Sequence, residues 1–178
     1  IIHIDTAMTR LGFGAEEWQA LCADENWHDG LAIHYLMSHL ASADDPDAAQ
    51  NKTQLALFHE LTQNTPYAKS LANSGGVTLG QAFHFSLTRP GLSIYGLSPL
   101  DNEALPDLRC ALYLSADILQ TRDIKKGTTI GYGATFVAPH DMRVATLGIG
   151  YADGLLRHYK DHLCVRVNET PCPVIGRI

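Results

Sequence analysis

Two kinds of hydrophobic pattern divide the chain, and their order restricts the fold more than any other feature. Up to about residue 75, short apolar runs of strand length alternate with stretches in which apolar residues recur at helical spacing. After about residue 108, only strand-length runs remain, separated by turn sequences such as Lys-Lys-Gly and Asn-Glu-Thr-Pro. Alternating strands and helices favour a parallel sheet with covering helices, whereas successive short strands favour an all-β unit. We therefore predict an α/β part in residues 1–107 and an all-β part in residues 108–178.

Residue spacing sets the expected elements of the α/β part. Trp18, Leu21 and Cys22 stand at i, i+3 and i+4, which is the spacing of one helix face. Later in the chain, Asp-Pro marks a helix start, and apolar residues then recur at helical spacing. The predicted strands are residues 1–4, 31–37 and 68–72, and the predicted helices are residues 15–27 and a stretch ending near residue 63.

The all-β part contains a tyrosine in an unusual setting. Its predicted strands are residues 110–124, 128–138, 143–149, 163–167 and 172–178. In the second of them, Tyr132 stands between Gly131 and Gly133 in the run "TIGYGATF". Glycines on both sides remove the packing that a strand tyrosine usually has, so another group can approach the phenol closely.

Composition and charge exclude several classes of protein. The net charge is −6, and no basic patch with interleaved aromatic residues is present, so we expect no nucleic-acid partner. No apolar run reaches about 18 residues, so we expect no membrane span. The four cysteines lack CxxC spacing and fall in apolar patterns, which predicts reduced, buried cysteines of a cytosolic protein. No histidine pair has metal-ligand spacing beside a carboxylate, so we predict no metal site.

The two ends of the chain both fall inside apolar strand patterns. The first residues read "IIHID" and the last read "PVIGRI". A separate domain rarely starts and stops within its own strands. We therefore expect the chain to be an internal piece of a longer protein.

Two glycine-containing turns follow predicted strands of the α/β part. They are "NSGG", residues 73–76, and "RPGLSIYG", residues 89–96. Such turns expose backbone N–H groups that bind anions, and barrels of parallel strands place phosphate sites at their late strands. A plain turn explains either motif alone, and the pair leaves a phosphorylated cofactor and two ordinary turns equally open.

Three further stretches carry groups capable of chemistry. "DTAMTRLGF", residues 5–13, contains Arg10; "SHLASAD", residues 38–44, contains His39. "GYADGLLR", residues 150–157, contains Tyr151. Taken singly, these are compatible with a solvated arginine, a structural histidine and an ordinary turn.

Taken together and in this order, the motifs resemble those of alanine racemases, bacterial pyridoxal-phosphate enzymes of fold type III. "KKGTTIGYGATF" and "PVIGRI" add two further matches, so the resemblance covers nearly the whole chain. It implies the later strands of a (β/α)8 barrel up to residue 107, followed by a β-strand-rich C-terminal domain. It also implies a cytoplasmic isomerase of alanine, working as a homodimer with shared active sites, whose D-alanine serves peptidoglycan synthesis or whose role is alanine breakdown.

The resemblance assigns three catalytic positions. Tyr132 matches a base that exchanges the α-proton of alanine bound in the partner subunit, while a lysine serves the opposite face. A free tyrosine has a pKa near 10 and needs nearby positive charge to act as a base at neutral pH. His39 matches the histidine that hydrogen-bonds this tyrosine. Arg89 matches the arginine that faces the pyridine nitrogen of the cofactor and supports the histidine.

Other positions match residues that bind cofactor or substrate. Asn73, Ser74, Gly91 and Leu92 match the phosphate-binding region. Arg10 matches the arginine that contacts the phenolic oxygen of the cofactor and the substrate carboxylate. The remaining matches line the substrate entrance, and they are Tyr151, Asp44, Arg157 and Arg177.

The chain also departs from the family pattern. It has no counterpart of the lysine that forms a Schiff base with pyridoxal phosphate, nor of the segment that follows the "PVIGRI" match in the family. We therefore expect the full-length protein to be active and this piece alone to be inactive. His3 stands where many members have a carbamylated lysine that holds the arginine matching Arg10. Either another anion positions Arg10, or His3 itself hydrogen-bonds nearby.

Two other functions compete with alanine racemisation. One is a broad-specificity amino-acid racemase of the same fold, which altered residues near Asp44 and Tyr151 would indicate. The other is a non-catalytic module that binds the cofactor or a partner. The joint presence of Tyr132, His39, Arg89 and Arg10 argues against a module, since a binder has no use for a proton relay.

Overall fold

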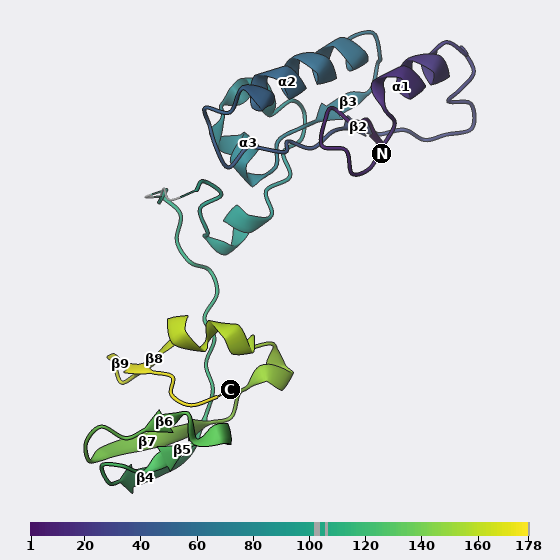
Figure 1. The fold of residues 1–178 in the computed structure, drawn as a ribbon. Coiled ribbons are helices and arrows are strands. Elements are labelled where there is room, and N and C mark those ends of the chain that lie inside the picture. Colours follow the sequence, from purple (N-terminus) through teal and green to yellow (C-terminus); the bar gives the residue numbers. More distant parts are fainter. Residues whose placement is uncertain (102–103, 106, 178) are drawn as a thin grey trace. The chain divides into compact units, whose positions relative to one another are not determined.

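The computed structural model describes residues 1–101, 104–105 and 107–177. The chain divides into two compact units, Ile1–Tyr113 and Leu114–Ile178 (Figure 1). The predicted boundary between residues 107 and 108 lies a few residues earlier and stays a prediction. Within the described part of the chain, no helix combines the length and the apolar character that crossing a bilayer requires.

A parallel sheet with strand order β1-β2-β3 forms the centre of the first unit. Its strands are β1 (Ile2–His3), β2 (Tyr35–Met37) and β3 (Ala68–Ser70). Two helices connect them, α1 (Ala15–Cys22) and α2 (Ala49–Thr62) (Figure 1). This order of elements confirms the predicted α/β class.

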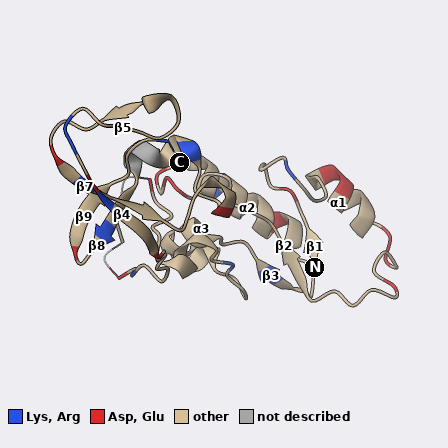
Figure 2. Cartoon of the chain, turned by 90° about the horizontal axis from the view of Figure 1, so that it is seen from below, with Lys and Arg blue, Asp and Glu red and all other residues tan. Residues whose placement is uncertain are grey.

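Helix α1 is shorter than predicted. Its first turn is acidic, as the red colour in Figure 2 shows, and the Glu17 carboxylate accepts the N–H of Gly14 at 2.8 Å. The prediction extended the helix to residue 27, which is wrong. After Cys22, the Asp24 carboxylate accepts the N–H of Asn26 at 2.9 Å, so a side-chain turn replaces the next helical turn.

The strands are also shorter than their apolar runs. The prediction gave residues 31–37 to one strand, but only Tyr35–Met37 pairs with neighbours. On one side, only Leu36 and Met37 of β2 pair with residues of β1. On the other side, all three residues of β2 pair with residues of β3. A strand ends where the hydrogen-bond ladder of its partners ends, whatever the hydrophobicity of the next residues.

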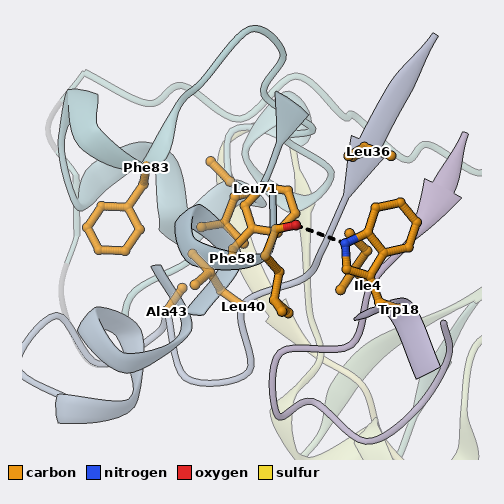
Figure 3. Packing of buried hydrophobic residues seen from close by; sticks show 10 residues of the cluster. Ile4, Trp18, Leu36, Leu40, Ala43, Phe58, Leu71 and Phe83 are labelled. Carbon is orange, nitrogen blue, oxygen red and sulfur yellow. Dashed lines mark hydrogen bonds between the residues drawn. The ribbon is translucent and has the colours of Figure 1, made fainter. Parts of the chain in front are cut away.

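One face of the sheet packs against the helices and forms the hydrophobic core. Ile4, Leu36 and Leu71 are fully buried there against Trp18 of α1 and Phe58 of α2 (Figure 3). The indole N–H of Trp18 donates to the carbonyl of Leu61 at 2.8 Å, so this large side chain is buried without an unpaired polar group. The hydrophobic core therefore lies between the sheet and helices α1 and α2.

The opposite face carries both polar and apolar side chains. His3, Met37 and Ser70 are direct cross-strand neighbours in one row. Because side chains alternate between faces along a strand, this row points away from the face that holds Leu36. This face continues into the segments that follow the strands.

The second unit consists of antiparallel strand pairs, which confirms the prediction of a β-rich part. The pairs are β4 (Ile118–Ile124) with β7 (Met142–Leu147), β5 (Thr129–Ile130) with β6 (Phe136–Val137), and β8 (Cys164–Val167) with β9 (Thr170–Pro173). The predicted strands over 110–124 and 172–178 are too long. Ile118 pairs with the last residue of β7 and Pro173 with the first of β8, so the pairing stops there.

The predicted strand over residues 128–138 is wrong at its centre. Gly131 and Gly133 both have φ of 73°, a left-handed conformation that an extended strand excludes. Between β5 and β6 the chain therefore forms the turn η3 (Tyr132–Ala134), which begins at the tyrosine. The flanking glycines bend the backbone outward, and Tyr132 is 78% exposed.

The cysteines are free, but the prediction that they are buried is wrong. Cys22, Cys110 and Cys164 are exposed and Cys172 is half-buried. Cys164 lies in a strand whose residues alternate between exposed and half-buried, and it occupies an exposed position. An apolar run therefore did not indicate burial, because a two-stranded sheet covers at most one of its faces.

Helix α3 (Ser74–Thr78) contacts the segment after β2 so closely that a glycine is required. A Cβ added at Gly75 would overlap the main-chain carbonyl of Ala43, whereas a Cβ added at Gly91 would meet nothing within 4 Å.

We expect Gly75→Ala to lower the free energy of unfolding by about 1–3 kcal/mol. Gly91→Ala, at φ of −105°, should change it by less than about 0.5 kcal/mol. Urea unfolding of both variants checks this, and equal stabilities would contradict it.

Candidate functional site

The carboxyl ends of the three parallel strands bring several predicted site residues together. His39 follows β2, and Asn73 and Ser74 follow β3. The segment that reaches Arg89 runs beside β3, since the N–H of Arg89 donates to the carbonyl of Ala72 at 2.8 Å. Residues far apart in the sequence therefore meet at one edge of the sheet.

The guanidinium of Arg89 is the most heavily hydrogen-bonded group of this site. It donates to the carbonyl of Ser38 at 2.6 Å, to the carbonyl of Leu71 at 3.4 Å and to the hydroxyl of Ser70. It also contacts Nδ1 of His39 at 3.5 Å. Burial lowers the pKa of Arg89, but an arginine stays protonated in proteins, so the site holds a fixed positive charge.

The contacts of His39 determine which ring nitrogen carries its proton. A guanidinium can only donate, so the contact with Arg89 requires Nδ1 to accept and places the proton of the neutral ring on Nε2. The amide nitrogen of Asn73, also a donor only, lies 3.4 Å from Nε2 and donates to the carbonyl of Leu40 at 3.2 Å. A neutral imidazole accepts at one nitrogen only, and the charged guanidinium is the stronger donor, which favours acceptance at Nδ1. The Nε2–H group of His39 therefore remains able to donate to a further acceptor.

Electrostatics favour this neutral form of His39. Burial lowers its pKa most, and the positive charges of Arg89, Arg10 and His3 lower it further. The pKa of His3 is also lowered, by burial and by Arg89 and Arg10, while Asp5 acts in the opposite direction. The strand ends thus form a positively charged region in which histidines stay unprotonated.

Backbone donors and a hydroxyl converge where the two glycine turns meet. The hydroxyl oxygen of Ser74 accepts the N–H of Gly91 at 2.9 Å and the N–H of Ser93 at 3.2 Å. With both acceptor positions used, its own O–H is free to donate outward. The Asn73 carboxamide caps α3 by accepting the N–H of Gly76 at 2.9 Å. A free hydroxyl donor beside a turn rich in main-chain N–H groups suits a phosphate group, so the residues fit a phosphorylated cofactor.

Ser93 belongs to this group although the sequence analysis did not select it. It lies in the turn η2 (Leu92–Tyr95), directly after the predicted positions Gly91 and Leu92. Its contribution is a backbone N–H, which residue type does not reveal. The glycine turn itself was the available signal.

The loop with Arg10 is fixed by its own hydrogen bonds. The Asp5 carboxylate accepts the N–H groups of Met8 and Thr9 at 2.9 to 3.0 Å. At Gly12, with φ of 105°, a Cβ would lie 2.6 Å from the carbonyl oxygen of His3, so the loop packs tightly against β1. Arg10 is exposed, and it is close enough to lower the pKa of His39.

His3 keeps one polar atom without a partner. Its Nε2 is buried and has no hydrogen-bond partner among the described residues. The alternative in which Nε2 of His3 holds the loop by a hydrogen bond therefore has no support here.

The remaining predicted residues are exposed. Asp44 lies in the first unit, after β2, and its carbonyl accepts the N–H of Asp101 at 3.2 Å. In the second unit, Gly131 lies close to the backbone of Arg177, since a Cβ added to this glycine would be 3.5 Å from the Arg177 nitrogen. The turn that contains Tyr132 is therefore next to the backbone around Arg177. The guanidinium of Arg157 lies 5.3 Å from the ring centre of Tyr151.

The predicted site residues thus fall into two groups. The first unit contains Arg10, His39, Asp44, Asn73, Ser74, Arg89, Gly91 and Leu92, and the second contains Tyr132, Tyr151, Arg157 and Arg177. Throughout the residues that the structure describes, no three histidine, cysteine or acidic side chains are grouped to hold a metal ion.

Comparison with protein families gives matches along most of the chain. A family model for the N-terminal domain of alanine racemase matches residues 1–99, and one for the C-terminal domain of alanine racemase matches residues 111–178. The chain is 44% identical to an alanine racemase of Jannaschia sp. and 41% identical to one of Dinoroseobacter shibae, each over 177 residues. Both alignments cover 99% of this chain but only 49% and 48% of the relatives, so the chain spans about half their length.

Solved structures give the same result. The alanine racemase of Bartonella henselae, a structure with covalently bound pyridoxal phosphate, matches with a TM-score of 0.84 and 35% identity. The alanine racemase of Streptomyces coelicolor matches with a TM-score of 0.88 and 28% identity. These matches cover 99% and 98% of this chain and 49% and 50% of the solved chains.

The lowered pKa of His39 predicts a pH dependence of stability. The unfolded chain binds a proton at the ordinary pKa near 6.5, before the folded chain does, so stability falls as pH drops through this value. We expect His39→Gln to reduce the loss of unfolding free energy between about pH 8 and about pH 5.5. Urea unfolding at both pH values measures it. Parallel losses in wild type and variant would contradict the assignment, since His3 alone would then carry the effect.

Proposed function

The chain belongs to the alanine racemase family, and on that premise we propose that the whole protein interconverts L-alanine and D-alanine with pyridoxal phosphate. The observation that carries the proposal is the Arg89–His39 contact beside the cluster of donors around Ser74. One group suits proton transfer and the other suits a phosphate. Their position at the same strand ends is what an enzyme with a phosphorylated cofactor requires.

The first unit contains residues suited to hold the cofactor. The hydroxyl of Ser74 and the N–H groups around Gly91 and Leu92 would bind its phosphate, with Asn73 supporting the turn. Arg89 would face the ring nitrogen and, as a permanent cation, would keep that nitrogen unprotonated. When bound, pyridoxal phosphate withdraws electrons from an attached amino acid, which makes the α-proton acidic enough to be transferred.

Tyr132 is the proposed base of this chain. Its phenolic oxygen would accept the α-proton of L-alanine bound in the first unit of a second subunit, and would return a proton in the reverse direction. His39 would donate from Nε2 to this oxygen, and the positive charge of Arg89 and Arg10 would favour the phenolate. The second base would be a lysine from a part of the protein outside this chain.

Substrate recognition would use charges on both units. Arg10 would bind the carboxylate of alanine, and Tyr151, Asp44, Arg157 and Arg177 would line the entrance. Charged groups along the entrance favour a small zwitterion over a larger apolar amino acid. We propose a homodimer in which each site combines the first unit of one subunit with the second unit of the other, working in the cytoplasm.

Removal of the Tyr132 hydroxyl tests the base. In the full-length protein, Tyr132→Phe should lower the rate of proton exchange from L-alanine by at least about 100-fold, since general-base catalysis contributes about that much. The cofactor should stay bound, as its absorbance spectrum reports. Tyr113→Phe is the control, because it removes a hydroxyl from an exposed tyrosine to which no site role is assigned. Racemisation by Tyr132→Phe at the wild-type rate would refute this role.

The phosphate site is tested by two serines that differ in the group they supply. Ser74→Ala removes the hydroxyl itself and should weaken cofactor binding about 10-fold, as expected for the loss of one hydrogen bond to a charged group. Ser93→Ala keeps the backbone N–H and should leave the affinity unchanged. Equilibrium titration with pyridoxal phosphate measures both. Equal effects would contradict the assignment.

A further inference from the structure

Helix α2 contains a glutamine whose side chain is completely buried and fully hydrogen-bonded. The Gln54 carbonyl oxygen accepts the N–H of Ala41 at 2.9 Å. Its amide nitrogen donates to the carbonyl of His39 at 3.0 Å and lies 3.3 Å from the hydroxyl of Thr6. One side chain thus binds the backbone on both sides of Leu40, directly after the predicted catalytic histidine.

The same short segment is bound from its other side. The amide of Asn73 donates to the carbonyl of Leu40 at 3.2 Å. Residues 39–41 lie beyond the end of β2, where no strand neighbour pairs with them. Two carboxamides therefore replace the missing ladder and fix the backbone that carries the imidazole of His39.

Gln54 also connects this segment to the partners of Arg89. The Thr6 hydroxyl, which Gln54 contacts, lies 2.7 Å from the hydroxyl of Ser38. The carbonyl of Ser38 in turn accepts a hydrogen bond from Arg89 at 2.6 Å. All three of these polar side chains, Thr6, Ser38 and Gln54, are fully buried. A buried polar network of this kind holds its members in one arrangement, because any displacement leaves a donor or acceptor unpaired.

We propose that Gln54 is a positioning residue for proton transfer, acting through the backbone of His39. By holding the carbonyl of His39, it fixes the position and orientation of the imidazole. Nδ1 then contacts Arg89, and Nε2–H is available to the phenolic oxygen of Tyr132, the proposed base. The inference rests on the proposed racemase function and adds a residue that touches neither cofactor nor substrate. Loss of Gln54 should therefore slow proton transfer without weakening substrate binding.

The chain provides a matched control one turn earlier on the same helix. Asn51 is also a buried carboxamide, 2% exposed, and its amide donates to the carbonyl of Asp45 at 2.9 Å. It makes no hydrogen bond to residues 39–41 among the described contacts. Replacement of Asn51 tests what the loss of any buried amide in α2 does to the enzyme.

The experiment compares Gln54→Met with Asn51→Leu in the full-length protein with pyridoxal phosphate bound. Both changes replace a buried carboxamide with an apolar side chain of similar length, so both should lower the melting temperature. Only Gln54→Met should lower kcat, by about 10-fold or more, with the KM for alanine and the cofactor spectrum nearly unchanged. If the two variants keep the same kcat, the inference is wrong while the proposed function stands. A wild-type protein that does not racemise alanine overturns both.

Gln54→Glu covers the case in which Gln54→Met does not fold. The carboxyl keeps an acceptor for Ala41 and, when protonated, a donor for the carbonyl of His39. When ionised it has no donor and repels that carbonyl. The ratio of the kcat of Gln54→Glu to that of wild type should therefore fall as pH rises, with the variant still folded by circular dichroism. A ratio independent of pH would overturn the inference.

Discussion

The site depends on how one half-buried guanidinium, that of Arg89, is hydrogen-bonded. Arg89 has no carboxylate partner among the described residues, and main-chain carbonyls and a serine hydroxyl accept its hydrogen bonds instead. These acceptors come from the ends of β2 and β3, so the arginine is held only while both strands keep their register. Burial lowers the pKa of His39 most, and because neutral dipoles do not cancel the charge of Arg89, its positive field lowers that pKa further.

The sequence predicted the elements and the motif residues better than their boundaries and supports. Strand and helix order followed from periodicity, but α1 ended early at a local Asp24 turn, and glycines at positive φ turned the run around Tyr132 out of extended conformation. Local hydrogen bonds and backbone dihedral angles set the end of α1 and the turn at Tyr132. The hydrophobic pattern of the sequence contains no information on either of them. His39, Asn73, Ser74 and Arg89 were selected by their motifs, and the structure places them at the same strand ends.

Gln54 shows why supporting residues were missed. A glutamine in a helix usually faces water, and the three partners of Gln54 lie 13, 15 and 48 positions away, beyond the reach of any local pattern. One signal was present all the same. Position 54 is on the same helix face as Phe58 and Leu61, four and seven residues later, so a polar side chain fell on the core stripe. A polar residue at such a position indicates a buried hydrogen-bond network.

The contact between Gly75 and Ala43 links the proposed phosphate-binding region to the proposed substrate entrance. Helix α3 begins at Ser74, the proposed phosphate-binding serine, and Ala43 directly precedes the proposed entrance residue Asp44. Main chain meets main chain there, so the two segments move as one body. A lineage that reshapes the entrance to admit a larger amino acid must therefore do so with side chains. Any change of the loop backbone would also displace the proposed phosphate site, which limits the paths along which specificity can evolve.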